Sequence, residues 1–281
     1  MSVRIIIDST ADLMPAVKAR TLVVPLTVHF GDEEYIDGVT MTHKQFYEKL
    51  VETDIVPRTS QANPEAFQKV YEEVTAAGDS AVVITIASGL SGTYQSAMIA
   101  AADYDNVQVV DSASVAIGSG ILAEYALQLA DSGMSAADIA ARLNEVKGRI
   151  HVIAMLDTLE YLWKGGRLSR TAAVAGGILN IKPVLAILDG EIKVLGKARG
   201  SKQANNLLQS EIAKAGGVDF GLPVMLGYTG LSDALLQKYI EDSKALWADS
   251  RTELNQTIIG SVIGTHAGPG AVAVAFFRKD A

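Results

Sequence analysis

The sequence contains no cysteine, which excludes disulfide bonds, zinc thiolate sites and thiol nucleophiles. Any covalent chemistry would need serine, threonine, lysine or a carboxylate. Positive charge is also scarce, because 24 Lys and Arg stand against 32 Asp and Glu, which gives a net charge of −8 at pH 7. Nucleic-acid-binding domains usually carry clustered Lys and Arg. A nucleic-acid partner is therefore not expected.

Long hydrophobic runs are missing as well. The N-terminal apolar run reaches Asp8 after three isoleucines, too short for the core of a signal peptide, so we expect a cytoplasmic protein. The nearest approach to a membrane span, Thr171–Leu188, is interrupted by Asn180, Lys182 and Pro183. A buried segment is predicted there rather than a span. The four histidines show no metal-ligand spacing, and no metal or other cofactor is expected.

The first half of the chain alternates between strand and helix patterns. This alternation is typical of a parallel sheet covered by helices, an α/β/α domain. The strands are expected at Val3–Ile7, Leu22–Phe30, Ala81–Ala87 and Val107–Asp111, and the helices at Pro15–Arg20, Thr42–Glu52, Pro64–Ala77, Gly118–Asp131 and Ser135–Lys147. Three helix starts carry capping residues, which are Thr42 with Gln45, Asn63 before Pro64, and Ser135 with Asp138.

The second half follows a different pattern. Asp189-Gly190 separates two apolar runs, Pro183–Leu188 and Glu191–Ala198, and Asp-Gly between such runs predicts a hairpin. Two further runs, Pro223–Tyr228 and Ala271–Phe277, flank a helix expected over Ser232–Leu246. We therefore expect a C-terminal α+β domain with an antiparallel or mixed sheet. The boundary is placed near residue 150, which gives domains 1–150 and 151–281 with a ligand crevice between them.

The segment Ala81–Thr93 combines a buried strand, a Ser-Gly-Leu-Ser-Gly loop and the start of a helix. The first N–H groups of a helix lack intrahelical partners and lie at the positive end of its dipole, so they favour an anion. Ser91 and Gly92 are therefore candidate anion contacts. An equally good interpretation is that Ser91 only caps its own helix.

Three sharper motif interpretations fail or weaken on the residues themselves. A nucleophile elbow needs Gly two residues after the serine, but Thr93 follows Ser91 at that distance. No Walker lysine is present. Gly118-Ser119-Gly120 begins a Gly-x-Gly-x-x-Ala pattern several residues beyond the strand at Val107–Asp111, so close helix packing is favoured over dinucleotide binding.

Three other segments gather polar or basic residues. The loop Arg58–Pro64 holds two hydroxyls and two amides, and most such loops are only caps and turns. Gly264–Gly270 reads as a rigid glycine-dense loop carrying His266, which could be structural or could contact a ligand. Lys164–Arg170 is a basic patch, either a solvated helix end or a docking site for an anion or acidic partner.

Taken together, the motifs of the chain resemble the DegV family, fatty-acid-binding carriers that serve as substrate subunits of bacterial fatty acid kinase. The resemblance runs along almost the whole chain and rests on the order of these motifs: Asp8–Leu13, Pro25–Val28, Thr59–Gln61, Ser88–Tyr94, Lys164–Arg167, Asn180–Pro183 and His266–Gly270. It implies a two-domain α/β protein that holds a long-chain fatty acid. It also implies that Thr59 and Ser91 bind the acyl carboxylate, with His266 nearby.

Under this interpretation the protein is a carrier without catalysis of its own, and its partner is the catalytic subunit of a fatty acid kinase. Arg167, Arg170 and Lys202 are then candidates for contacting that subunit or its nucleotide. A competing hypothesis is an acyl hydrolase in which Ser91 attacks and His266 is the base, although no orienting carboxylate is identifiable. A small-substrate phosphotransferase is supported only by fold analogy.

Overall fold

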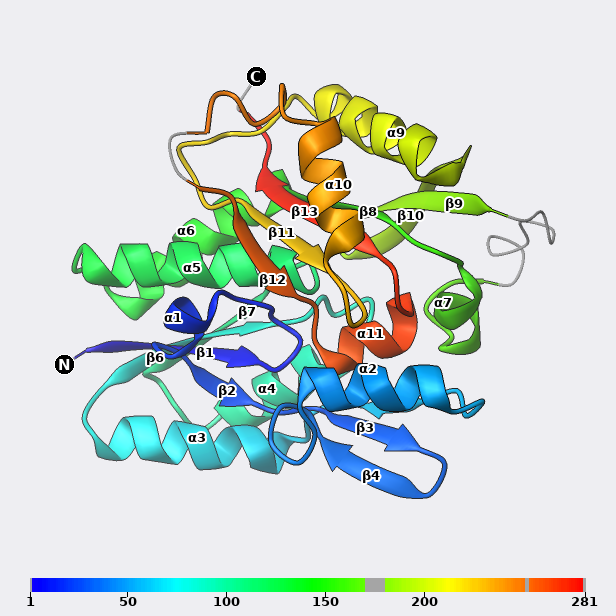
Figure 1. Cartoon of the computed structure of the whole chain (residues 1–281). Coiled ribbons are helices and arrows are strands. Elements are labelled where there is room, and N and C mark those ends of the chain that lie inside the picture. The colour runs from blue at the N-terminus through cyan, green and yellow to red at the C-terminus, as the bar shows by residue number, and fades with distance from the viewer. Residues whose placement is uncertain (1, 170–179, 251–252, 280–281) are drawn as a thin grey trace.

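The computed structural model describes residues 2–169, 180–250 and 253–279 (Figure 1). Four strands of the N-terminal half form a parallel sheet in the order β2-β1-β6-β7. Their bounds are β1 (Val3–Asp8), β2 (Leu22–Val24), β6 (Ser80–Thr85) and β7 (Val107–Asp111). A short helix, α1 (Pro15–Lys18), links β1 to β2. The predicted parallel sheet of the first half is confirmed.

Helices cover both faces of this sheet, because its strands are apolar on both sides. On one face, α5 (Ile117–Asp131) and α6 (Ala136–Val146) pack around Ile5 and Ile7. On the other, α3 (Pro64–Ala76) and α4 (Thr93–Ala101) pack around Ile6 and Val83. A strand with apolar residues on both faces needs two covering layers. The expected α/β/α arrangement therefore follows directly from the strand sequences.

The second half forms a six-stranded sheet of mixed orientation, in the order β10-β9-β8-β13-β11-β12. Only β11 and β12 are parallel among the pairs in this described sheet. Its strands are β8 (Ile150–Met155), β9 (Ile181–Leu188), β10 (Glu191–Arg199), β11 (Met225–Tyr228), β12 (Asn255–Ile258) and β13 (Val272–Phe277), preceded by a 3₁₀ turn (Lys147–Arg149). The expected mixed sheet is confirmed.

The two faces of this sheet meet different partners. The outer face, which includes Ile153 and Met155, is covered by α9 (Gly200–Lys214) and α10 (Ala234–Asp242) (Figure 1). The inner face, which includes Val152 and Ala154, belongs to the same apolar core as α5. Helix α5 thus lies between the two sheets. The helix expected over residues 232–246 is shorter than predicted, because α10 spans only Ala234–Asp242.

A third sheet was not expected from the sequence. The run Leu22–Phe30, predicted as one strand, is divided between β2 and β3 (Thr27–Phe30). Pro25 follows β2 directly and has no N–H to donate to a ladder. After this break β3 pairs on one side with β4 (Glu33–Ile36) and on the other with β5 (Arg58–Ser60). This small antiparallel sheet, not a loop, carries Thr59.

The local signals for helix starts and the hairpin are confirmed. The Thr42 hydroxyl accepts the Gln45 N–H in a complete capping box at the start of α2 (His43–Glu52). Asn63 and Ser135 accept the N–H groups of Ala66 and Asp138 at the starts of α3 and α6. Asp189 and Gly190 have φ of 51° and 76° between β9 and β10, as a two-residue type I′ turn requires.

The glycine-dense loop predicted over Gly264–Gly270 is wrong for its first half. Helix α11 spans Ser261–Ala267, so Gly264 and His266 are helical. A Cβ on Gly264 would lie 2.5 Å from Tyr47 Oη and 2.8 Å from Phe46 Cε1. This glycine lets α11 pack tightly on α2 instead of forming a turn. Left-handed backbone begins only at Gly268, with φ of 70°.

The two glycines at the start of α5 also serve close packing, as predicted. A Cβ on Gly118 would lie 2.4 Å from Val152 Cγ2, and a Cβ on Gly120 would lie 2.0 Å from the Asp12 carbonyl oxygen. Both distances are too short for any side chain. The glycines therefore let α5 contact β8 on one side and the loop after β1 on the other.

In the described part of the chain, no helix is both long enough and apolar enough to cross a membrane. Within Thr171–Leu188, residues 171–179 lie outside the described residues, and Ile181–Leu188 is strand β9. The division into domains at residue 150 stays a prediction. Helix α11 from the second half packs against α2, β3 and β5 of the first half. Elements of the two halves are therefore packed directly against each other.

Candidate functional site

An apolar cavity of about 380 Å³ lies between the two halves of the protein. Its volume falls within the ~300–1,000 Å³ typical of small-molecule sites. The inner face of the six-stranded sheet, α11, α7 (Glu160–Lys164) and the loop before α5 supply most of its wall. The apolar lining is formed by Leu26, Ile86, Leu90, Val115, Ala116, Val152, Ala154, Leu156, Leu162, Leu185, Ile187, Ile192, Ile259, Val262, Ile263, Ala267, Ala271 and Ala273.

The polar part of the lining is small and clustered. It consists of Thr59, Ser60, Gln61, Ser91, Gly92, Arg167 and His266. Four separate segments supply these residues: β5 with the residue after it, the loop before α4, the turn after α7, and α11. The four residues predicted to bind a carboxylate, Thr59, Ser91, Gly92 and His266, are all half-buried cavity-lining residues.

Thr59 and His266 are joined directly although 207 residues separate them in the sequence. Thr59 Oγ1 and His266 Nε2 are 3.0 Å apart in a hydrogen bond between β5 and α11. Burial, and secondarily the charge of Arg167, lower the pKa of His266 to about 4. The imidazole is therefore neutral at neutral pH, and Arg167 carries the positive charge of the site.

Ser91 lies at the start of α4 with its hydroxyl fixed locally. Its Oγ is 2.9 Å from Thr93 Oγ1 and accepts the Thr93 N–H at 3.3 Å. Gly92 is the N-cap residue of the helix. Ser91 is therefore not the N-cap residue, but its hydroxyl accepts the first N–H of the helix and the residue lines the cavity. Because α4 begins beside the cavity, the positive end of its dipole lies close to any anion held there.

Close packing against Gln61 requires glycine at position 92, which the sequence alone did not reveal. A Cβ at this position would lie 2.1 Å from Gln61 Oε1. The amide of Gln61 therefore lies directly over the start of α4, and its Nε2 donates to Ser96 Oγ at 3.0 Å. Gln61 and Ser60 line the cavity but were not proposed as site residues. The sequence signals for them were their position in the same polar segment as Thr59 and their place in the Thr59–Gln61 motif.

Arg167 contributes to the wall of the cavity and does not simply extend into solvent. Its Nε donates to the Leu90 carbonyl at 3.2 Å and its Nη1 donates to the Gly165 carbonyl at 2.7 Å. These bonds tie the turn after α7 to the loop before α4. The guanidinium is consequently held at the polar end of the cavity with a charge to offer a carboxylate.

The other two predicted cations are not placed beside Arg167. Arg170 lies outside the described residues. Lys202 is exposed on α9, which covers the outer face of the six-stranded sheet, whereas the cavity lies on the inner face. The pKa of Asp242 is lowered, chiefly because Asn205 donates a hydrogen bond to this carboxylate. The charge of Lys202 makes a smaller contribution in the same direction. The sheet separates Lys202 from the polar cluster.

The geometry does not assemble a hydrolytic triad. The hydroxyl bonded to His266 is that of Thr59, whereas Ser91 bonds to Thr93. His266 Nδ1 is buried and has no hydrogen-bond partner among the described residues, so no carboxylate orients the ring. Within those residues, no group of three or more His, Asp or Glu side chains could hold a metal ion.

A family model and curated relatives match almost the whole chain. The family model described as "Uncharacterised protein, DegV family" matches residues 2–279. The chain belongs to the DegV family. A DegV domain-containing protein of Caldanaerobacter subterraneus is 37% identical to this DegV protein over 285 residues, covering 99% of each chain.

Solved structures share the fold of this DegV protein over its full length. A structure described as the fatty acid binding of a DegV family protein from Thermus thermophilus has a TM-score of 0.87 and 29% identity, covering 99% of this chain and 100% of the other. The fatty acid kinase B3 protein of Streptococcus pneumoniae, loaded with linoleic acid, has a TM-score of 0.86 over the same shares. At 23% identity it shows likeness of fold alone.

Gly165 determines how closely α7 approaches the histidine. A Cβ at this position would lie 2.2 Å from His266 Nδ1 and 3.0 Å from the Tyr161 carbonyl. We expect Gly165→Ala to displace the imidazole and break its bond to Thr59, so that the pKa of His266 rises from about 4 toward the usual 6.5. NMR titration of the His266 ring measures this effect. Gly148→Ala, where a Cβ meets nothing within 4 Å, is the control, and equal pKa values of His266 in the two variants would contradict the prediction.

Proposed function

We propose that this DegV protein is a cytoplasmic carrier that binds one long-chain fatty acid and presents its carboxylate to the catalytic subunit of a fatty acid kinase, with no catalysis of its own. The observation that carries the proposal is the pairing of an apolar cavity with one polar cluster, in which Arg167 is the one cation among the described lining residues. An amphipathic molecule with one acidic head group matches both parts.

The apolar part supplies the affinity. A saturated tail of about 15 methylenes at ~0.8 kcal/mol each contributes roughly 12 kcal/mol of gross transfer free energy. Loss of translational freedom and ordering of the chain oppose this gain. Because the cavity already exists in the folded protein, its wall does not have to be separated to admit the tail.

The polar part supplies the orientation. A carboxylate without partners would be expensive to bury. Thr59 and Ser91 offer hydroxyls, Arg167 offers a guanidinium, and the start of α4 offers N–H groups. The neutral His266 supports Thr59 by hydrogen bonding. Charge-assisted hydrogen bonds of this kind are the strong ones.

Presentation to a kinase requires a head group within reach of the surface. Thr59, Ser91, Arg167 and His266 are half-buried rather than buried, so the polar end is the accessible end of the site. The Thermus thermophilus relative is described by its fatty acid binding, and the family resemblance adds the kinase partner. Arg167 is close enough to the head group to contact an acyl phosphate as well.

The test begins with the protein as purified. It is denatured, extracted with organic solvent and analysed by mass spectrometry, and we expect about one fatty acid per chain. Addition of ATP and a fatty acid kinase catalytic subunit should then yield acyl phosphate, whereas the carrier alone should yield none. An extract without fatty acid, together with no binding of added oleate or palmitate, would reject the carrier. Hydrolysis of nitrophenyl esters that disappears in Ser91→Ala would establish the hydrolase instead.

A further inference from the structure

The end of β12 and its connection to α11 are held by the N-terminal half of the protein at three points. Thr257 Oγ1 donates to the Leu13 carbonyl at 3.4 Å. Tyr47 Oη donates to the Ile259 carbonyl at 2.8 Å. The Gly260 N–H donates to Asp12 Oδ1 at 2.9 Å. The last of these bonds fixes the residue from which α11 starts, and α11 carries His266.

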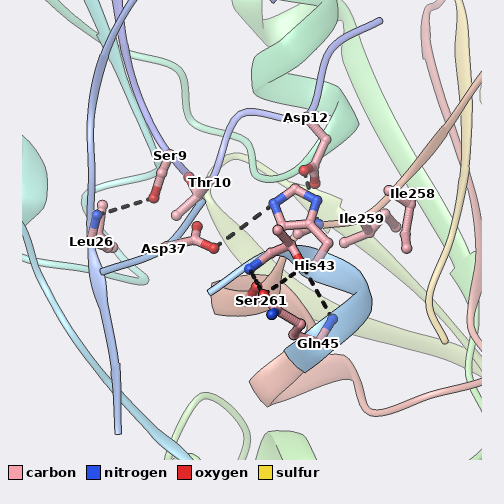
Figure 2. A network of polar contacts seen from close by, with 12 residues as sticks. Ser9, Thr10, Asp12, Leu26, Asp37, His43, Gln45, Ile258, Ile259 and Ser261 are labelled. Carbon is pink, nitrogen blue, oxygen red and sulfur yellow. Dashed lines mark hydrogen bonds and ion pairs between the residues drawn. The ribbon is translucent and has the colours of Figure 1, made fainter. Parts of the chain in front are cut away.

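Asp12 is a rigid acceptor. Its N–H donates to the Ala116 carbonyl at 3.2 Å, and its own carbonyl lies against Gly120 of α5. Its side chain is buried in a polar cluster with Asp37 and His43 (Figure 2). Burial is the main reason why the pKa of Asp12 is raised well above its usual range. A carboxyl kept in so unfavourable a place needs a specific role, because its desolvation is costly.

The start of α11 has little freedom to move past this cluster. A Cβ on Gly260 would lie 3.1 Å from Asp12 Oδ1 and 3.0 Å from His43 Nε2, so the backbone itself touches both side chains. His266 follows Gly260 by six residues, about 9 Å along a helix. A short helix moves as a unit, and the His266–Thr59 bond, at 3.0 Å, tolerates only a few tenths of an ångström before it fails.

We propose that Asp12 is a positioning residue: by accepting the Gly260 N–H, it fixes the start of α11 and so holds His266 in hydrogen-bonding register with Thr59. Its effect on ligand binding rests on the proposed function. The placement of the imidazole itself does not. In the sequence, Asp12 stood out only as part of the Asp8–Leu13 motif. This motif supplies no residue to the lining of the cavity.

The experiment compares Asp12→Ala with Asp12→Asn in the full chain. NMR titration of the His266 ring reports its environment without any ligand. We expect a pKa of about 4 in the unaltered protein and in Asp12→Asn, because the amide oxygen still accepts the Gly260 N–H. In Asp12→Ala the pKa should rise toward the usual 6.5 as the ring gains water, and oleate should bind about tenfold more weakly.

Asp219→Ala is the control, since Asp219 also accepts a backbone N–H, that of Gly221 at 3.0 Å, and pairs with Arg149 rather than with any residue of α11. It should leave the His266 titration unchanged. If Asp12→Ala does not fold, Gly260→Ala disturbs the same contact more mildly and should shift the pKa in the same direction. An unchanged His266 pKa in the folded variant, or equal defects in Asp12→Ala and Asp12→Asn, would overturn the proposal. Absence of oleate binding by the unaltered protein would reject the carrier function and leave the titration result standing.

Discussion

Thr59→Ala combined with Ser91→Ala is expected to abolish the proposed binding of fatty acid, so that solvent extracts of the purified double variant contain little or none. Both hydroxyls line the polar end of the cavity, and Thr59 also anchors His266. Each hydrogen bond to a charged group contributes roughly 1.5–3 kcal/mol. Losing two should weaken oleate binding by more than about a hundredfold.

Extraction with mass spectrometry and titration with oleate measure this effect. The fold should persist, because both residues are only partly buried. Thr40→Ala combined with Ser132→Ala removes two exposed hydroxyls elsewhere and should retain the ligand. A double variant at Thr59 and Ser91 that retained stoichiometric fatty acid would show that the carboxylate binds elsewhere.

Ala154→Phe is expected to abolish binding of long-chain fatty acids by filling the cavity from its floor. Ala154 lies on β8 in the middle of the six-stranded sheet and lines the cavity, and its neighbours Ile153 and Met155 point into the opposite core. A phenyl ring would occupy space that the tail otherwise uses. Burial of the whole tail contributes roughly 12 kcal/mol of gross transfer free energy. If the ring excludes about a third of the tail, about 4 kcal/mol is lost, and binding weakens by more than about a hundredfold.

Titration with palmitate and a thermal melt test this prediction together. The ring enters existing space, so the melting temperature should fall by no more than a few degrees, about what 1 kcal/mol produces in a chain of this size. Ala141→Phe on the exposed face of α6 is the control. Undiminished palmitate affinity in Ala154→Phe would mean that the tail does not lie over this floor.

Local features of the fold could be predicted because they depend on neighbouring residues. The capping box at Thr42 and the Asp189-Gly190 turn are each settled within four residues. A strand with apolar residues on both faces, such as Val3–Asp8, indicates a sheet that is covered on both sides. The helical packing of Gly118 and Gly120 followed from their distance beyond the preceding strand.

The errors arose where tertiary contacts overrode a local signal. The run Leu22–Phe30 is apolar and β-branched on both sides of Pro25, but this proline interrupts the ladder and the pairing of β3 with β5 places the two parts in different sheets. Glycine at 264 suggested a turn, but its small size is used where α11 meets Tyr47. Propensity cannot distinguish a glycine needed for its backbone from one needed for its missing side chain.

By itself the sequence determined the alternation of strands and helices in the first half, three helix starts, the hairpin, and the membership of Thr59, Ser91 and His266 in polar segments. Only the tertiary structure decided that Thr59 and His266 meet across 207 residues, that Arg167 lines the cavity while Lys202 lies behind a sheet, and that a cavity exists at all. Backbone preferences act over a few residues, whereas a cavity is the space left by the packing of segments distant in the chain.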